Sequence, residues 1–201
     1  MNIDKENVIG SILDSISRID YIRPEEIPNI ALYMDQVTTF MDAHLESSKR
    51  YEEDKILTKT MINNYTKNHL LPPSDKKKYS TEHILLLIFI YYFKGFLSIN
   101  DIQTLLQPLS DRYFSSEEGM SLTDIYNEAF SMEKEQIEFL KKDVKEKYER
   151  SRETFADAPA GEREFLQLFS FICLLSFDVY LKKQIIENLI DLLPPPAKGR
   201  K

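Results

Sequence analysis

Four polar residues that could contact a nucleic acid recur at helical spacing in one short segment of the sequence. They are Thr60, Asn63, Asn64 and Lys67. Residues at these intervals share one face of an α-helix. Asparagine and threonine side chains can hydrogen-bond base edges in a major groove, and lysine binds phosphate oxygens. The pattern predicts a helix that contacts DNA or, as the alternative, a polar helix face exposed to solvent.

The flanking residues define the start, the buried side and the end of this helix. Thr58 is a candidate N-cap, and the helix should run to about Asn68. Its apolar side carries Met61, Ile62 and Tyr65, spaced for burial. Pro72 and Pro73 stop the chain from continuing as helix. The basic run beyond the prolines consists of Lys76, Lys77 and Lys78 and ends at Tyr79. These three lysines could neutralise phosphates as point charges.

Residues 60–106 resemble a winged helix-turn-helix of the MerR type. The resemblance rests on five pieces in the family's order: Ile62-Asn63-Asn64-Tyr65, Leu70-Leu71-Pro72-Pro73, Lys76-Lys77-Lys78-Tyr79-Ser80, Thr81-Glu82-His83-Ile84 and Leu97-Ser98-Ile99-Asn100-Asp101-Ile102-Gln103-Thr104-Leu105-Leu106. It implies binding of double-stranded DNA through the residues Thr58, Thr60, Asn63, Asn64, Lys67, Lys76, Lys77, Lys78 and Tyr79. The whole chain also resembles an uncharacterised bacterial family that is known only as a domain of unknown function.

The sequence departs from the MerR pattern in three places. Asn63-Asn64-Tyr65 stands where the family usually carries Arg-Tyr-Tyr, so an arginine that would hold a phosphate is missing. The wing is short, because Ser74-Asp75 leads directly into the lysines. A charged insertion at residues 46–55 separates the two helices of the motif, and it either loops out or extends one of them. The resemblance implies DNA binding but no sequence preference.

The composition and periodicity indicate the fold class, and the positions of the charged residues show where the chain is basic. The chain has 201 residues, 42% of them hydrophobic, with 12 Phe and 11 Tyr but only 5 Gly. Its long 3.6-residue periodicities predict a mainly all-α protein. The net charge of −7 opposes nucleic-acid binding, but residues 49–98 hold nine basic and five acidic groups, a net charge of +4. This basic block coincides with the predicted DNA-contacting segment, and salt screens it from distant acidic surfaces.

The periodicity outlines seven helical segments. They are residues 3–19, a segment from Pro28 to about His44 that forms the first helix of the motif, Thr58–Asn68, Ser80–Phe93, Ile99–Leu106 ended by Pro108, one long helix from Ser121 to about Phe155, and Glu162–Leu193. The segment Ile84–Phe93 is apolar on nearly all sides, so it should be the central core helix. It is too short to cross a membrane.

These segments predict two domains. Residues 1–110 should form a winged helix-turn-helix-like DNA-binding domain with a short wing and an extra N-terminal helix. Residues 111–201 should form a C-terminal helical hairpin or bundle that serves dimerisation or sensing. The apolar surface of the last helix exceeds what one neighbour covers, which favours a homodimer over the alternative of a monomeric bundle built around that helix. Two-fold symmetry would suit a palindromic operator.

Nothing in the residue pattern favours catalysis, a cofactor or a metal site. His44, His69 and His83 lie in separate segments, and His69 is best interpreted as a turn residue. The single Cys173 excludes an internal disulfide and is expected to fill space in a core. The first residues lack the order of a signal peptide, which favours a cytoplasmic location. The leading hypothesis is a DNA-binding transcriptional regulator. The alternative is an α-helical interaction protein that retains a winged-helix core.

Overall fold

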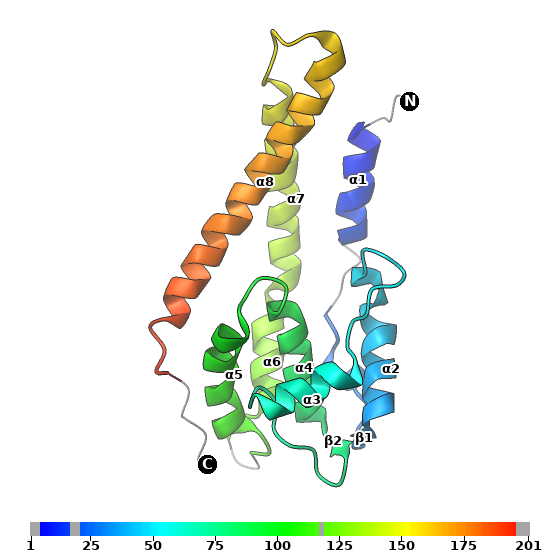
Figure 1. Ribbon diagram of the computed structural model, residues 1–201, viewed down its shortest axis with the longest axis vertical. Helices are drawn as coiled ribbons and strands as arrows, with labels where there is room; N and C mark the ends of the chain where they lie inside the picture. The colour runs from blue at the N-terminus through cyan, green and yellow to red at the C-terminus, as the bar shows by residue number, and fades with distance from the viewer. Residues whose placement is uncertain (1–4, 17–20, 117–118, 196–201) are drawn as a thin grey trace. The chain divides into compact units, whose positions relative to one another are not determined.

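The computed structural model describes residues 5–16, 21–116 and 119–195, and it is mainly helical (Figure 1). The chain divides into two compact units. The core unit comprises Ile19–Ser131 and Leu189–Lys201, and the hairpin unit comprises Met1–Arg18 and Met132–Asn188. The boundary predicted at residue 110 therefore falls inside a helix of the core unit, and the predicted N-terminal helix belongs to the other unit.

The core unit contains five α-helices, two short 3-10 helices and two short strands among its described residues. In chain order they are η1 (Pro24–Glu26), β1 (Leu32–Tyr33), α2 (Met34–Leu45), η2 (Glu46–Ser48), α3 (Lys59–Lys67), β2 (Lys78–Tyr79), α4 (Thr81–Phe93), α5 (Ile99–Tyr113) and α6 (Leu122–Ser131). The two strands pair antiparallel, with Leu32 opposite Tyr79 and Tyr33 opposite Lys78. This pairing joins the segment before α2 to the segment before α4.

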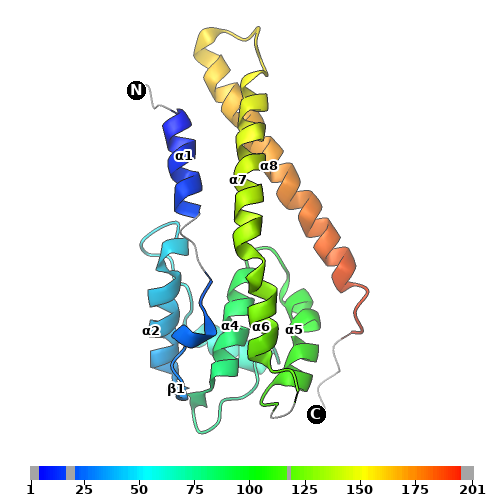
Figure 2. The same ribbon diagram turned by 180° about the vertical axis from the view of Figure 1, so that it is seen from behind.

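Helix α4 is the centre of the core unit, as its uniformly apolar sequence predicts. Every residue from Ile84 to Ile90 is at most 6% exposed. The helix packs against α5, α6 and β2, and Figures 1 and 2 show it between α2 and α5. Phe89 packs in an aromatic cluster with Tyr126 and Phe130 of α6, and it meets the Tyr126 ring edge to face. The hydroxyl of Tyr126 donates a buried 2.7 Å hydrogen bond to the carbonyl of Ile22, which ties the start of the unit to its last helix.

The prediction of a helix starting at Pro28 is wrong, because α2 begins only at Met34. Leu32 and Tyr33 are extended and pair with β2. The backbone N–H of Tyr33 donates to Oε1 of Gln36 at 2.8 Å, which satisfies a free donor at the start of α2. A two-residue strand is too short to produce a sequence periodicity, so the apolar residues before Met34 resembled a helical stripe.

Two further helix boundaries differ from prediction. Helix α5 continues through Pro108 to Tyr113, whereas the sequence predicted its end at Leu106. Ser98 caps its start, accepting the N–H of Asp101 on Oγ at 3.1 Å. The single long helix predicted from Ser121 is in fact α6 and α7, with the break at Met132. The break separates the two units, and periodicity alone did not reveal it because both helices carry apolar residues in compatible phase.

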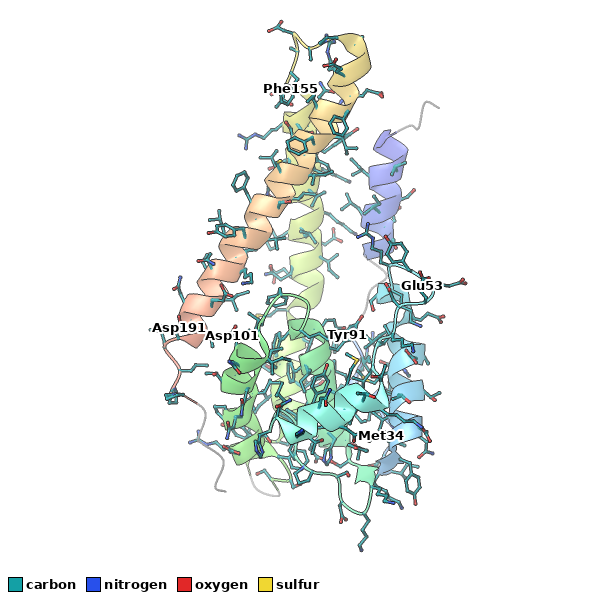
Figure 3. The ribbon with its side chains drawn as sticks, viewed as in Figure 1. Met34, Glu53, Tyr91, Asp101, Phe155 and Asp191 are labelled. Carbon is teal, nitrogen blue, oxygen red and sulfur yellow. The ribbon has the colours of Figure 1, made fainter. Side chains whose placement is uncertain are left out.

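The hairpin unit contains α1 (Lys5–Ile16), α7 (Glu133–Arg152) and most of α8 (Ala160–Ile190). The predicted ends of the first helix, residues 3–4 and 17–19, lie outside the described residues. Helices α7 and α8 are joined by a loop that contains Phe155 (Figure 3). Tyr148 meets Phe171 edge to face with ring centroids 5.4 Å apart, and Lys147 Nζ lies 2.6 Å from a carboxylate oxygen of Asp178. These contacts confirm the predicted hairpin of the last two helices.

Candidate nucleic-acid interface

Helix α3 presents the polar face that the sequence predicts. Thr58 precedes it and accepts the backbone N–H of Met61 on Oγ1 at 3.2 Å, so it is an N-cap. Ile62 and Tyr65 are buried, at 0% and 7% exposure, and Met61 is half-buried. Burial raises the pKa of the Tyr65 hydroxyl. The exposed side carries Thr60, Asn63, Asn64 and Lys67. At about 100° per residue these four positions span an arc of about 100°, so they form one face.

The end of α3 is fixed by a Schellman motif. The N–H of Leu70 donates to the carbonyl of Tyr65 at 2.9 Å, and the N–H of His69 donates to the carbonyl of Thr66 at 3.2 Å. His69 adopts a left-handed conformation with φ of 57°, a position that glycine usually occupies. Its side chain is exposed. The structure thus agrees with the interpretation of His69 as a turn residue.

The three lysines lie on a tight turn that leads into β2, at the lower edge of the core unit in Figure 1. The N–H of Lys78 donates to the carbonyl of Asp75 at 2.8 Å, and these two residues form an antiparallel bridge. Lys76 and Lys77 occupy the two central positions with φ of 47° and 65°, as in a type I′ turn. All three lysine side chains are exposed. We name residues 75–78 the lysine turn.

The last two residues of the predicted contact segment point in different directions. Lys78 places Nζ 5.3 Å from the ring centroid of Tyr33, which is 54% exposed on β1. Tyr79 is only 4% exposed and contacts His83 edge to face, so its side chain packs in the core and is not available to a ligand. The alternation of a strand explains both, since neighbouring side chains face opposite sides. Sequence reasoning missed Tyr33 because it lay within the predicted helix.

His83 holds the base of the lysine turn from inside the core unit. Its Nδ1 accepts the backbone N–H of Ser80 at 3.0 Å, and its Nε2 lies 3.4 Å from the carbonyl of Pro73. The ring is 4% exposed and also meets Phe114 edge to face. Burial lowers the pKa of this imidazole, which favours its neutral form. The neutral tautomer can both accept from Ser80 and donate towards Pro73, so it links the two ends of the loop.

The charged insertion between α2 and α3 forms a 3-10 turn and then a loop. The carboxylate of Asp54 accepts the backbone N–H groups of Arg50 and Tyr51, at 3.2 and 3.0 Å. Lys94 Nζ donates to the carbonyl of Ile56 at 2.8 Å and anchors the loop to the end of α4. Glu53 points outwards from it (Figure 3). Of the two alternatives for the insertion, the structure therefore supports the loop.

One other basic residue of α3 is engaged within the core unit. Lys59, beside the polar face, pairs with Asp35 of α2. No cluster of three or more histidine, cysteine or acidic side chains that could hold a metal occurs within residues 5–16, 21–116 and 119–195. Cys173 is half-buried on α8. Of the predicted contact residues, all except Thr58 and Tyr79 are exposed.

The chain belongs to the family described as domain of unknown function DUF1836, which matches residues 22–129. This range nearly coincides with the first segment of the core unit, so the matched part of the chain contains α3, the lysine turn and the helices that support them. No curated protein and no solved structure matches the chain.

Proposed function

We propose that this protein is a non-catalytic transcriptional regulator that binds double-stranded DNA through α3 and the lysine turn. The observation that carries the proposal is the exposed face of Thr60, Asn63, Asn64 and Lys67 on a capped helix whose opposite side is buried. Such a helix can enter a major groove while its buried side keeps it fixed to the protein. The lysine turn comes next in the chain and would contact phosphates.

The order of elements supports a more specific proposal, a winged helix-turn-helix of the MerR type. Helices α2 and α3 pack together, and the lysine turn leads through β2 into the central helix α4. In this proposal α2 and α3 are the two helices of the motif, and the lysine turn is a shortened wing braced by β1. Charge is distributed to match, since residues 49–98 carry a net +4 in a chain of net −7.

The test is the salt dependence of duplex binding. We expect the affinity of the wild-type chain for duplex DNA to fall linearly on a log-log plot against salt. Replacement of Lys76, Lys77 and Lys78 by glutamate should reduce the magnitude of the slope by about 2.7, at about 0.9 per neutralised phosphate. A matched control replaces Lys141, Lys142 and Lys145 of α7 by glutamate, and it should leave the slope unchanged. Wild-type chain that shows no salt-dependent binding would contradict the proposal.

We also propose that the protein binds DNA as a homodimer, with α8 as the interface. Ten large apolar side chains of α8 are more than 40% exposed: Phe165, Leu168, Phe169, Ile172, Phe177, Val179, Tyr180, Leu181, Ile185 and Leu189. The largest apolar patch of a typical monomer covers about 300–600 Å², and a stable interface buries about 800 Å² per partner, so this many exposed apolar side chains on one helix favour a partner.

The spacing along α8 favours a second copy of the same helix as the occupant. A heptad repeat runs through Phe165, Leu168, Ile172, Leu175, Val179, Lys182, Ile186 and Leu189. All of these except Lys182 are apolar, as in the seam of a coiled coil. An antiparallel pair of α8 helices would place Lys182 away from its counterpart, so this orientation avoids repulsion between like charges.

Helix α8 is also long and apolar enough to cross a membrane, by length and composition alone. Its partner α7 argues against this use, because α7 is densely charged and contacts α8 through the Lys147–Asp178 pair and the Tyr148–Phe171 rings. Insertion of α8 would bury these charges in lipid or break the hairpin. Sedimentation at micromolar concentration tests the dimer: a single 23.6 kDa species would contradict it.

A second candidate function is an interaction protein that binds another protein through α8. The exposed apolar side chains of α8 favour it, since a helix face of this kind can dock an amphipathic partner. The salt experiment separates the two functions. An interaction protein would bind duplex DNA weakly or not at all. Glutamate at the lysine turn would not change its affinity for its protein partner.

A further inference from the structure

Three basic residues between α3 and β2 adopt a backbone conformation that suits glycine better. His69, Lys76 and Lys77 have φ of 57°, 47° and 65°. Among the described residues, the other non-glycine residues with positive φ are Ser115 and Phe155. A residue with a Cβ is disfavoured in this region, whereas glycine enters it at no steric cost. The segment therefore carries a basic side chain at each position where glycine would give a more stable backbone.

Hydrogen bonds and strand pairing hold these conformations in place. The Schellman bonds of Leu70 and His69 fix the first position, and the hydrogen bond from Lys78 to Asp75 fixes the other two. Pairing of β2 with β1 sets the register behind the turn, and His83 links Ser80 to the Pro73 carbonyl. A disfavoured conformation persists only where its surroundings impose it, and such residues concentrate at functional sites.

We propose that His69, Lys76 and Lys77 are retained at these positions as phosphate contacts that flank the polar face of α3. His69 stands just beyond the end of α3, and the two lysines stand at the turn before β2. An imidazole N–H and two ammonium groups can each donate to phosphate oxygens. The proposal rests on the proposed function and adds His69 to the contact residues.

The proposal predicts that glycine substitution moves stability and DNA binding in opposite directions. His69→Gly and the double variant Lys76→Gly/Lys77→Gly should each raise Tm by a few degrees, about 1–4 °C, because a disfavoured backbone is relieved. His69→Gly should weaken duplex binding about 2- to 10-fold through loss of one hydrogen bond. The double variant should reduce the magnitude of the salt slope by about 1.8.

Ser115→Gly is the matched control, because Ser115 also has φ of 57° but carries no charge. It should raise Tm in the same way and leave duplex binding unchanged. Because every variant is expected to be at least as stable as the wild type, weakened binding cannot be attributed to unfolding.

The outcomes separate this inference from the proposed function. If the wild type binds duplex DNA and the three-glutamate variant does not, but the glycine variants bind like the wild type, the inference is overturned and the proposed function stands. If the wild type binds no duplex DNA, the proposed function fails and the inference fails with it. Weakened binding of both glycine variants with a raised Tm, alongside an unaffected Ser115→Gly, supports the inference.

Discussion

The two most apolar helices of this protein, α4 and α8, differ in how far the chain itself covers them. Residues Ile84–Ile90 of α4 are enclosed by other elements of the core unit and are at most 6% exposed. Helix α8 is more than twice as long, yet only 6% of its most apolar 18-residue stretch is buried. Two helices of similar chemistry thus have almost opposite exposure.

The difference shows what apolar composition does and does not specify. A helix that is apolar on all sides must be covered, but the sequence does not say by what. For α4 the cover comes from α5, α6 and β2 of the same chain. For α8 the chain supplies α7 on one side, through Phe171, Asp178 and their partners. The rest of α8 is the reason for proposing a second copy.

The largest expected effect comes from truncating a matched leucine in each helix. Leu86 of α4 is 0% exposed and Leu181 of α8 is 57% exposed and outside the heptad repeat. Leu86→Ala should lower the free energy of unfolding by about 2–5 kcal/mol, because it removes buried contacts and leaves a cavity. Leu181→Ala should lower the free energy of unfolding by less than about 0.5 kcal/mol. Urea unfolding followed by circular dichroism measures both, and equal costs would break the comparison.

A second prediction concerns the proposed cover of α8. The double variant Ile172→Asp/Val179→Asp should weaken self-association by at least about 30-fold, or about 2 kcal/mol, because it places charges in the seam. Sedimentation should then give the 23.6 kDa monomer with unchanged helix content. Ile99→Asp, at a 43% exposed apolar position of α5, is the control and should leave association intact. A wild type and double variant with the same mass would contradict α8 as the dimer interface.

A third prediction concerns the first turn of α4, where His83 is buried in the neutral form. Because burial lowers the pKa of His83, at a pH between the folded-state and unfolded-state pKa values the unfolded chain binds a proton on His83 that the folded chain does not. Its contribution to stability is therefore complete above about pH 6.5 and is lost as the pH falls towards the folded-state pKa. His83→Gln, which retains an acceptor for the Ser80 N–H, should flatten this acid dependence of Tm.

The smallest expected effect tests how α8 is attached to α7. Asp178→Asn removes one of the two carboxylate partners of Lys147 Nζ, at 2.6 Å, and leaves Asp143 as the other, so it should lower the free energy of unfolding by about 0.3–1 kcal/mol. Glu146→Gln disrupts the exposed Lys142–Glu146 pair, 3.9 Å apart, and should have no measurable effect. Thermal unfolding at low and high salt measures the difference, which should shrink as salt screens the pair. A loss that does not depend on salt would point to packing instead of charge.

Much of the core unit could be predicted because its helices carry strong local signals. Ile62 and Tyr65 are buried and Asn63 and Asn64 exposed, as a 3.6-residue period requires. Thr58 caps α3 as predicted, and Ser98, a residue type that favours the N-cap position, caps α5. The central place of α4 could be inferred from its composition alone.

The errors occurred where long-range contacts overrule local signals. Leu32 and Tyr33 form a strand only because Tyr79 and Lys78, far along the chain, pair with them. Tyr79 was assigned to the DNA contact surface, but strand alternation and His83 place its ring in the core. Pro108 lies inside α5, where the surrounding helix tolerates it. No local sequence pattern predicts the β1 strand, the burial of Tyr79 or the position of Pro108 inside a helix.

The sequence by itself determined the helical class, the polar face of α3, the basic segment and the apolar character of α4 and α8, because each depends on residue type and spacing along one helix. Only the tertiary structure decided the pairing of β1 with β2, the left-handed turns at His69, Lys76 and Lys77, and the burial of His83. These features depend on contacts between residues distant in sequence or on backbone angles that side-chain chemistry alone disfavours.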